Sequence, residues 1–247
     1  MIRKRCTAVV LAAGSGSRMK SSTAKQFMLL DGKPLIWYSL HAMEQSNIID
    51  DCVLVTGAED IPYVRRDIVE KNAFHKVDLV VAGGRERCES VYNALCAMAA
   101  GGMRVANQEG YVFIHDGARP FVTEGLLESM YEQVCRHHAC VAAVPVKDTI
   151  KIADEYGFVA RTLERKYLWA VQTPQVFETA LITEAYRRLF EQTGGWKNGE
   201  GHIAMTDDAM VLETMLKVPV KLVESSYENI KITTPEDMRA AECICAG

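Results

Sequence analysis

The sequence lacks a strong net charge and a long apolar run. Its 247 residues include 28 Lys and Arg against 32 Asp and Glu, a formal net charge of −4. Such a mildly acidic chain has no general attraction to nucleic acid or to an anionic membrane. No run approaches the roughly 18 apolar residues of a membrane-spanning helix, so no membrane partner is expected. Any anion that the protein binds must be held by a local group of cations.

The sequence also lacks paired-cysteine motifs. It has eight cysteines but no Cys-x-x-Cys pair, which argues against a structural zinc site. Several cysteines lie in apolar runs such as Cys52–Thr56, where a reduced thiol packs as a small hydrophobic group. We therefore expect free thiols and a cytoplasmic location.

The composition is that of a globular protein, with 49% apolar and 24% charged residues and no internal repeat. A chain of this length is at the upper end of what one domain holds, and we predict a single domain over residues 1–247.

Short apolar runs alternate with segments of helical spacing. The runs are apolar on both faces, which is typical of strands buried between two layers of helices. Strands are predicted over Ala8–Leu11, Cys52–Thr56, Leu79–Ala82, Val112–His115, Val141–Val144 and Val218–Val223. Helices are predicted over Leu35–Gln45, Ile61–Lys71, Glu86–Ala99, Glu124–His137, Thr179–Glu191 and Asp207–Leu216, with a last one from Thr234. The alternation predicts an α/β fold with a Rossmann-like, doubly wound, mostly parallel sheet.

One segment breaks the alternation. Residues 147–172 read as two antiparallel strands around a turn at 155–157, outside the main sheet. We predict a protruding β-arm at about residues 147–170. A two-stranded arm is marginally stable alone, so we expect it to pack on something else, such as a second subunit.

A glycine-rich turn at residues 12–16 follows the first predicted strand. Backbone N–H groups in such a turn can approach phosphates closely. The turn is not the dinucleotide fingerprint, because Met19 takes the place of the third glycine, and no Walker A Gly-Lys-Ser/Thr follows. Two cations, Arg18 and Lys25, come next and could neutralise a triphosphate. Phosphate binding is therefore favoured over a plain tight turn.

Asp116 and Arg119 follow another apolar run. A carboxylate at the carboxyl end of a strand is well placed to hold Mg²⁺ together with phosphate oxygens, and Arg119 could bind a second anion. A capping aspartate with a surface arginine explains the same residues about as well. His115 is predicted to be a packed, hydrogen-bonded side chain rather than a catalyst.

Three further groups are weaker signals, since capping or surface roles would also explain them. The Gly83-Gly84 turn opens a helix in which Ser90 could donate to a ligand. Arg165 precedes a Gln-Thr-Pro-Gln run, and Lys231 precedes the last helix.

Taken in order, the motifs AAGSGSRM, AKQF, HDGARPF, KDTIK, WAVQTPQVF, TDDA and NIKITTPEDM form a specific pattern. From about Thr7 to about Ala241 the chain resembles the 2-C-methyl-D-erythritol 4-phosphate cytidylyltransferases of the non-mevalonate isoprenoid pathway. The first loop alone is shared by many nucleotidyltransferases, so the ordered set carries the resemblance.

The resemblance implies a nucleotide-diphospho-sugar transferase-like fold that dimerises through its β-arm. It implies transfer of CMP from CTP to 2-C-methyl-D-erythritol 4-phosphate, which gives 4-diphosphocytidyl-2-C-methyl-D-erythritol and pyrophosphate with the help of Mg²⁺.

The resemblance also assigns roles to individual residues. Arg18 and Lys25 match the family's catalytic cations, and Asp116 matches its metal-associated carboxylate. The positions matching the CTP site are Ala12, Ala13, Gly14, Ser15, Gly16, Gly83, Gly84 and Ser90. Those matching the acceptor-phosphate site are Arg119, Thr149, Arg165, Thr173 and Lys231. In the family, the arm residues Thr149 and Arg165 reach into the neighbouring subunit.

The chemistry of the reaction agrees with these residue types. The acceptor phosphate is already a nucleophile, so no side chain must be activated. The enzyme must align two mutually repelling phosphates and neutralise the transition state, which calls for cations, Mg²⁺ and backbone donors.

Two alternatives stay open. Ribitol-5-phosphate cytidylyltransferase has the same fold and chemistry, although the Leu168-Trp169 pair before the Gln-Thr-Pro-Gln run favours the methylerythritol enzyme. A non-catalytic nucleotide-binding protein is the alternative of another class, and the number of retained cations argues against it.

Overall fold

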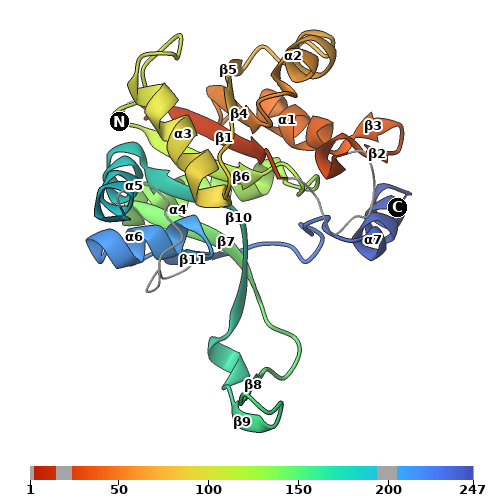
Figure 1. The fold of residues 1–247 in the computed structure, drawn as a ribbon, viewed down its shortest axis with the longest axis vertical. Coiled ribbons are helices and arrows are strands. Elements are labelled where there is room, and N and C mark those ends of the chain that lie inside the picture. The colour runs from red at the N-terminus through yellow and green to blue at the C-terminus, as the bar shows by residue number, and fades with distance from the viewer. Residues whose placement is uncertain (1–2, 15–23, 194–204, 247) are drawn as a thin grey trace.

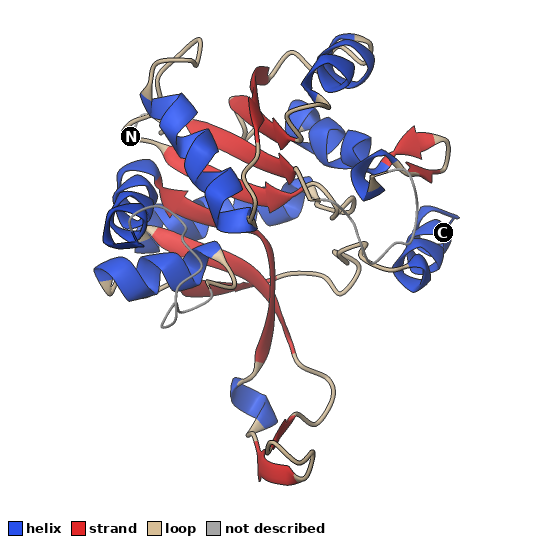
Figure 2. Cartoon of the chain, in the orientation of Figure 1, coloured by secondary structure: helices blue, strands red, loops and turns tan. Residues whose placement is uncertain are grey.

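A seven-stranded sheet with helices on both faces forms the body of the molecule (Figures 1 and 2). The structure is a computed structural model that describes residues 3–14, 24–193 and 205–246. The strands of this sheet are β1 (Cys6–Ala12), β4 (Asp51–Thr56), β5 (Val77–Ala82), β6 (Tyr111–Asp116), β7 (Ala139–Pro145), β10 (Trp169–Glu178) and β11 (Lys221–Glu224). The α-helices are α1 (Leu35–Gln45), α2 (Ile61–Tyr63), α3 (Arg87–Ala99), α4 (Glu124–His137), α5 (Thr179–Thr193), α6 (Asp208–Leu216) and α7 (Pro235–Ala246). Shorter elements are η2 (Lys25–Phe27), η3 (Val64–Glu70), η4 (Arg165–Tyr167) and the two-stranded sheets β2 (Leu29–Leu30) with β3 (Lys33–Pro34) and β8 (Lys151–Ala153) with β9 (Val159–Thr162).

The strand order is β11-β7-β10-β6-β1-β4-β5. Neighbouring strands are parallel except at β10, which runs antiparallel to both β6 and β7. This confirms the predicted mostly parallel sheet. The chain winds from β1 outward to β4 and β5 and then crosses back to β6 on the other side of β1. At such a reversal the carboxyl ends of the two central strands flank a crevice, which is where ligands bind in open α/β sheets.

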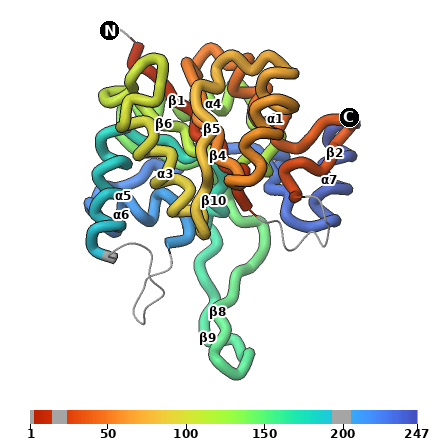
Figure 3. Tube along the Cα trace, turned by 45° about the horizontal axis from the view of Figure 1, so that its top comes forward, coloured from red at the N-terminus to blue at the C-terminus, as the bar shows by residue number. Residues whose placement is uncertain are grey.

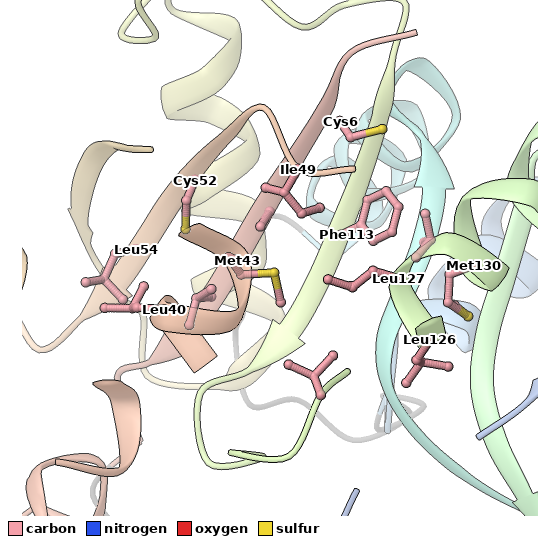
Figure 4. Close-up of a cluster of buried hydrophobic side chains, with 14 of the residues drawn as sticks. Cys6, Leu40, Met43, Ile49, Cys52, Leu54, Phe113, Leu126, Leu127 and Met130 are labelled. Atoms are coloured by element: carbon pink, nitrogen blue, oxygen red, sulfur yellow. The ribbon is translucent and has the colours of Figure 1, made fainter. Parts of the chain in front are cut away.

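The strands β1, β4, β6 and β7 are buried on both faces, as the apolar runs predict. Along β1, Cys6, Ala8 and Val10 pack into the core under α1 and α4, whereas Val9 and Leu11 face the core under α3, α5 and α6. Figure 4 shows the first core, with Met43 of α1, Leu127 and Met130 of α4 and Phe113 of β6 among its side chains. A third, smaller cluster joins β2 to α7, which lie together in Figure 3. The two large cores hold the carboxyl ends of β1 and β6 in fixed positions.

A hairpin lies within the segment predicted as an arm. Strands β8 and β9 pair antiparallel outside the main sheet, and the arm extends away from the body in Figures 1 and 3. The next strand, β10, begins at Trp169, which pairs with Pro145 of β7, so the arm joins the main sheet there. The pairing is interrupted between Val171 and Gln175, a stretch that contains Pro174, and a proline within a run argues against a strand in the sequence.

Two other predicted elements differ from the structure. The predicted strand Val218–Val223 is observed as β11 over Lys221–Glu224. The predicted helix Ile61–Lys71 is a single α-turn continued by η3, a π-helical segment. Both differences lie away from the crevice.

All eight cysteines carry free thiols, as expected from their spacing. No helix in the described ranges combines the length and the apolar character needed to cross a membrane.

Candidate active site

Two adjoining cavities lie at the carboxyl ends of β1 and β6. The first, of about 330 Å³, is lined by Leu11, Ala12, Ala13, Gly14, Lys25, Gln26, Gly84, Arg85, Glu86, Arg87, Ser90, Asp116, Ala118 and Lys231. The second, of about 240 Å³, is lined by Arg87, Asp116, Arg119, Val171, Gln172, Thr173, Gln175, Thr206, Asp207 and Lys231. Arg87, Asp116 and Lys231 line both, so the two cavities meet at this one carboxylate and two cations.

Asp116 is the last residue of β6, opposite Leu11 of β1 in the parallel register. Its carboxylate accepts from Arg87 Nε at 3.1 Å on Oδ1 and lies 2.7 Å from Lys231 Nζ on Oδ2. The residue is 7% exposed. Burial alone would raise the pKa of this carboxyl, but Arg87 and Lys231 outweigh it and hold the pKa well below its ordinary value. Asp116 is therefore a permanent anion at the junction of the cavities.

Arg87, the first residue of α3, is a site residue that the sequence analysis missed. Its guanidinium donates two hydrogen bonds to the fully buried Asp208 carboxylate, at 2.9 and 2.8 Å. Tyr186 of α5 donates a third hydrogen bond to Asp208, at 2.6 Å. Burial would lower the pKa of Arg87, but the two aspartates raise it well above its usual value. Arg87 is thus a fixed cation on the wall shared by the cavities.

His115 organises the residues around Asp116. The Asp116 N–H donates to Thr173 Oγ1 at 3.0 Å, and that hydroxyl lies 3.1 Å from His115 Nδ1. His115 Nε2 lies 3.0 Å from the Arg119 carbonyl oxygen, so the ring donates there and accepts from Thr173. Burial lowers the pKa of His115 to about 4. The ring is therefore neutral at pH 7 and structural, as the sequence analysis expects.

Arg119 is a buried cation that lines the second cavity. Its Nη1 donates to the Asn229 carbonyl oxygen at 2.6 Å, whereas its Nε has no hydrogen-bond partner among the described residues. The residue is 9% exposed, and burial lowers the pKa of the guanidinium although Asp116 raises it. An arginine stays protonated in either case. A buried cation with an unpaired N–H, next to Lys231 and Thr173, fits an anionic ligand such as a phosphate.

The structure brings together most of the residues predicted to bind CTP. Ala12, Ala13, Gly14, Gly84 and Ser90 line the first cavity with Lys25. Gly83 supports them, because a Cβ atom at this position would lie 2.2 Å from the Ala13 Cβ. Ser15, Gly16 and Arg18 lie outside the described residues.

The Ser90 hydroxyl makes two hydrogen bonds within the chain. It accepts from the Gly84 N–H at 3.0 Å and donates to the Glu86 carbonyl oxygen at 3.1 Å. Its proton is therefore used within the chain, and Ser90 shapes the glycine turn from inside.

The acceptor residues divide into two groups. Arg119, Thr173 and Lys231 line the second cavity. Thr149 and Arg165 are exposed on the arm and line neither cavity. Arg165 Nη1 instead donates to the Lys147 carbonyl oxygen at 2.8 Å. The chain alone does not bring these two arm residues to its own acceptor cavity.

Comparisons with known proteins agree on one family. The family model of 2-C-methyl-D-erythritol 4-phosphate cytidylyltransferase matches residues 6–246. Proteins of that name from Lachnospira eligens and Pelotomaculum thermopropionicum are 46% and 43% identical, over 98% and 97% of this chain and 99% and 94% of theirs. The crystal structure of 4-diphosphocytidyl-2C-methyl-D-erythritol synthase from Anaerococcus prevotii aligns with a TM-score of 0.81 at 30% identity, covering 99% of this chain and 97% of that one.

Proposed function

The chain belongs to the 2-C-methyl-D-erythritol 4-phosphate cytidylyltransferase family, and we propose that the two cavities joined at Asp116 form its active site. The reaction transfers CMP from CTP to 2-C-methyl-D-erythritol 4-phosphate and releases pyrophosphate. The observation that supports this site is the meeting of two cation-lined cavities at the reversal point of the sheet. One cavity is available for each phosphate-bearing substrate.

We assign CTP to the first cavity and the acceptor phosphate to the second. The first has the small residues Ala13, Gly14 and Gly84, whose backbone N–H groups can approach a triphosphate. The second has Arg119, whose Nε–H has no hydrogen-bond partner in the part of the chain that the structure describes. An acceptor phosphate oxygen attacks the α-phosphorus while the bond to the bridging oxygen of the β-phosphate breaks, and pyrophosphate leaves. The nucleophile is already ionised, so no proton has to be removed.

The chain's cations hold the two substrates together and stabilise the charge that develops. Lys25 lines the CTP cavity, Arg119 lines the acceptor cavity, and Arg87 and Lys231 line both. Because Arg87 is fixed by Asp208, it needs no reorganisation during the reaction, which is the condition for effective electrostatic catalysis. For Arg18 we retain the prediction from the resemblance, which is a catalytic cation.

Asp116 fits Mg²⁺ as a single carboxylate ligand. It is an ionised oxygen ligand at the junction of the cavities, and Mg²⁺ takes one or two carboxylates together with substrate phosphate oxygens. The side chain of Lys231 is 35% exposed, so it can move from Asp116 to a phosphate. When bound, the ion would neutralise phosphate charge next to the α-phosphorus.

We further propose a homodimer formed through the arm. Tyr156, Phe158 and Tyr167 are 78%, 73% and 71% exposed. Aromatic side chains this exposed on a thin arm mark an interaction surface. By the family resemblance, Thr149 and Arg165 of each arm would then lie at the other subunit's acceptor cavity. The eight free thiols support a cytoplasmic location.

Pyrophosphate release with CTP and Mg²⁺ tests the function. Methylerythritol 4-phosphate and ribitol 5-phosphate should be compared at equal concentrations, and a strong preference for the first is expected. If the enzyme preferred ribitol 5-phosphate, the assignment of the CTP site would stand and the assignment of the acceptor would change. Tight CTP binding without pyrophosphate release for either acceptor would instead support the non-catalytic alternative.

A further inference from the structure

The base of the arm contacts the segment of residues 225–229 through one lysine and one tyrosine. Lys147 Nζ lies 3.5 Å from the centre of the Tyr227 ring, a close cation–π contact. The Tyr227 hydroxyl donates to the Pro145 carbonyl oxygen at 2.7 Å. Pro145 ends β7 and Lys147 follows it, so both contacts tie the segment to the point where the arm leaves the sheet.

The same segment contacts residues that line the acceptor cavity. Gln172 Nε2 donates to the Ser226 carbonyl oxygen at 3.1 Å, and Asn229 Nδ2 donates to Gln172 Oε1 at 3.0 Å and to the Thr173 carbonyl oxygen at 2.9 Å. The Asn229 carbonyl oxygen in turn accepts from Arg119 Nη1. Two residues later, Lys231 pairs with Asp116. The position of this segment therefore sets the positions of Arg119 and Lys231, two of the cations that line the acceptor cavity.

The segment has no regular structure of its own. It lies between the end of β11 at Glu224 and the start of α7 at Pro235, and its internal bonds are turn contacts such as Asn229 N–H to the Ser226 carbonyl oxygen at 3.2 Å. Beyond Ser225, whose N–H donates to the Ala143 carbonyl oxygen of β7 at 2.9 Å, tertiary contacts such as those of Tyr227 and Asn229 determine the position of the segment. Asn229 is buried, whereas Tyr227 is 44% exposed at the surface end.

We propose that Lys147 and Tyr227 are positioning residues for the acceptor site: they fasten segment 225–229 to the base of the arm and so hold Arg119 and Lys231 in place. Arg165 of the arm belongs to the same group of contacts, because it donates to the Lys147 carbonyl oxygen. The proposal rests on the proposed function, since it assigns the second cavity to the acceptor.

Steady-state kinetics with each substrate varied in turn test the proposal. Lys147→Met removes the cation and Tyr227→Leu removes both contacts. We expect the KM for the acceptor to rise roughly threefold to tenfold, the range for losing a cation–π contact or a hydrogen bond. The KM for CTP should stay within about twofold. Lys147→Arg, which can still lie over the ring, should restore the acceptor KM, and Tyr227→Phe should give a smaller rise because it keeps the ring.

Lys4→Met is the matched control. Lys4 also lies over a tyrosine ring, at 5.3 Å from the centre of Tyr111, but precedes the amino end of β1, at the edge of the sheet opposite the cavities. Its removal should leave both KM values unchanged. If Lys147→Met and Tyr227→Leu keep the wild-type acceptor KM, or raise the KM for CTP equally, the proposal is wrong.

Amide hydrogen exchange supplies a readout that needs no turnover. In Lys147→Met the amides of residues 225–231 should exchange faster than in the wild type, while those of β1 and β6 should not change. Unchanged exchange in 225–231 would overturn the proposal. If the wild-type enzyme released no pyrophosphate with either acceptor, the proposed function would be contradicted instead. Amide hydrogen exchange would still decide whether the Lys147 and Tyr227 contacts hold the segment.

Discussion

The crevice at Asp116 and the β-arm differ in the surroundings of their side chains: those of the crevice form ion pairs within the chain, and those of the arm are exposed. In the crevice, Asp116, Arg87 and Asp208 are joined by ion pairs, and Asp208 is fully buried. On the arm, all seven residues of β8 and β9 are exposed, and aromatic side chains face outward at its tip. The crevice is assembled by contacts within one chain, whereas the arm presents groups that this chain leaves uncovered.

The crevice and the arm are therefore expected to contribute to the reaction in different ways. The crevice supplies charged groups that are already in position. They can stabilise a transition state because α3, α5 and the sheet hold them rigidly. In the proposed homodimer, the arm would supply an interaction surface and would present Thr149 and Arg165 to the second subunit. Substitutions in the crevice should therefore change stability and chemistry, and substitutions at the arm tip should change assembly.

The largest effect on stability is expected from Arg87→Met. The substitution leaves the buried Asp208 carboxylate without its cation, which should lower the free energy of unfolding by about 3–5 kcal/mol. Arg87→Lys keeps a charge but not the paired hydrogen bonds, and should lose less. Arg239→Met, which breaks an exposed pair with Glu236, should change the value by less than about 1 kcal/mol. Urea unfolding measures all three, and equal losses for the two methionine variants would contradict the account of the crevice.

The next effect is on chemistry. Lys25→Ala removes a cation that lines the CTP cavity, and turnover should fall by roughly 10²–10³-fold, as for loss of one transition-state contact. Lys33→Ala, at an exposed position on the β2–β3 hairpin, is the control and should keep wild-type turnover. Pyrophosphate release at saturating substrates is the measurement. Near-normal turnover in folded Lys25→Ala would show that the assigned role is wrong.

His115 should make the crevice acid-sensitive. Burial lowers its folded-state pKa to about 4, from about 6.5 when unfolded. Below pH 6.5 the unfolded chain binds a proton at this ring and the folded chain does not, so stability falls as the pH drops toward 4. The expected loss is about 2–3 kcal/mol. His115→Gln keeps one donor and one acceptor but does not titrate, so its unfolding free energy should change less between pH 6.5 and 4. Identical pH dependence in both proteins would refute this.

The sequence predicts those parts of the site that follow local patterns. The run ending at Asp116 reads as a buried strand followed by polar residues, and the glycine turn at 12–16 follows the same rule after β1. Arg119, Thr173 and Lys231 were found through the ordered motifs, and the structure places them in one cavity.

Arg87 was missed because its role depends on a partner 121 positions away in the chain. No local spacing predicts that pair, although Asp208 belongs to a motif that the resemblance includes. The strand β10 was missed for a different reason. Pro174 removes a ladder hydrogen bond in the middle of its run, so the pattern of a strand is broken where the site needs Thr173 beside Asp116.

The smallest effect on the folded chain is expected from a substitution at the tip of the arm. Such a substitution tests whether the arm, unlike the crevice, acts through a second subunit. Phe158→Ser removes a 73% exposed aromatic side chain, so the folded chain itself loses little. If the tip is covered by a second subunit, the dissociation constant of the dimer should rise about 10–100-fold, since burying such a side chain contributes roughly 1–3 kcal/mol. Sedimentation over a dilution series measures this. Turnover per chain should fall in parallel with dissociation, because Thr149 and Arg165 would no longer reach the partner's acceptor cavity. A monomeric variant with full turnover would show that the crevice works without the arm of another subunit.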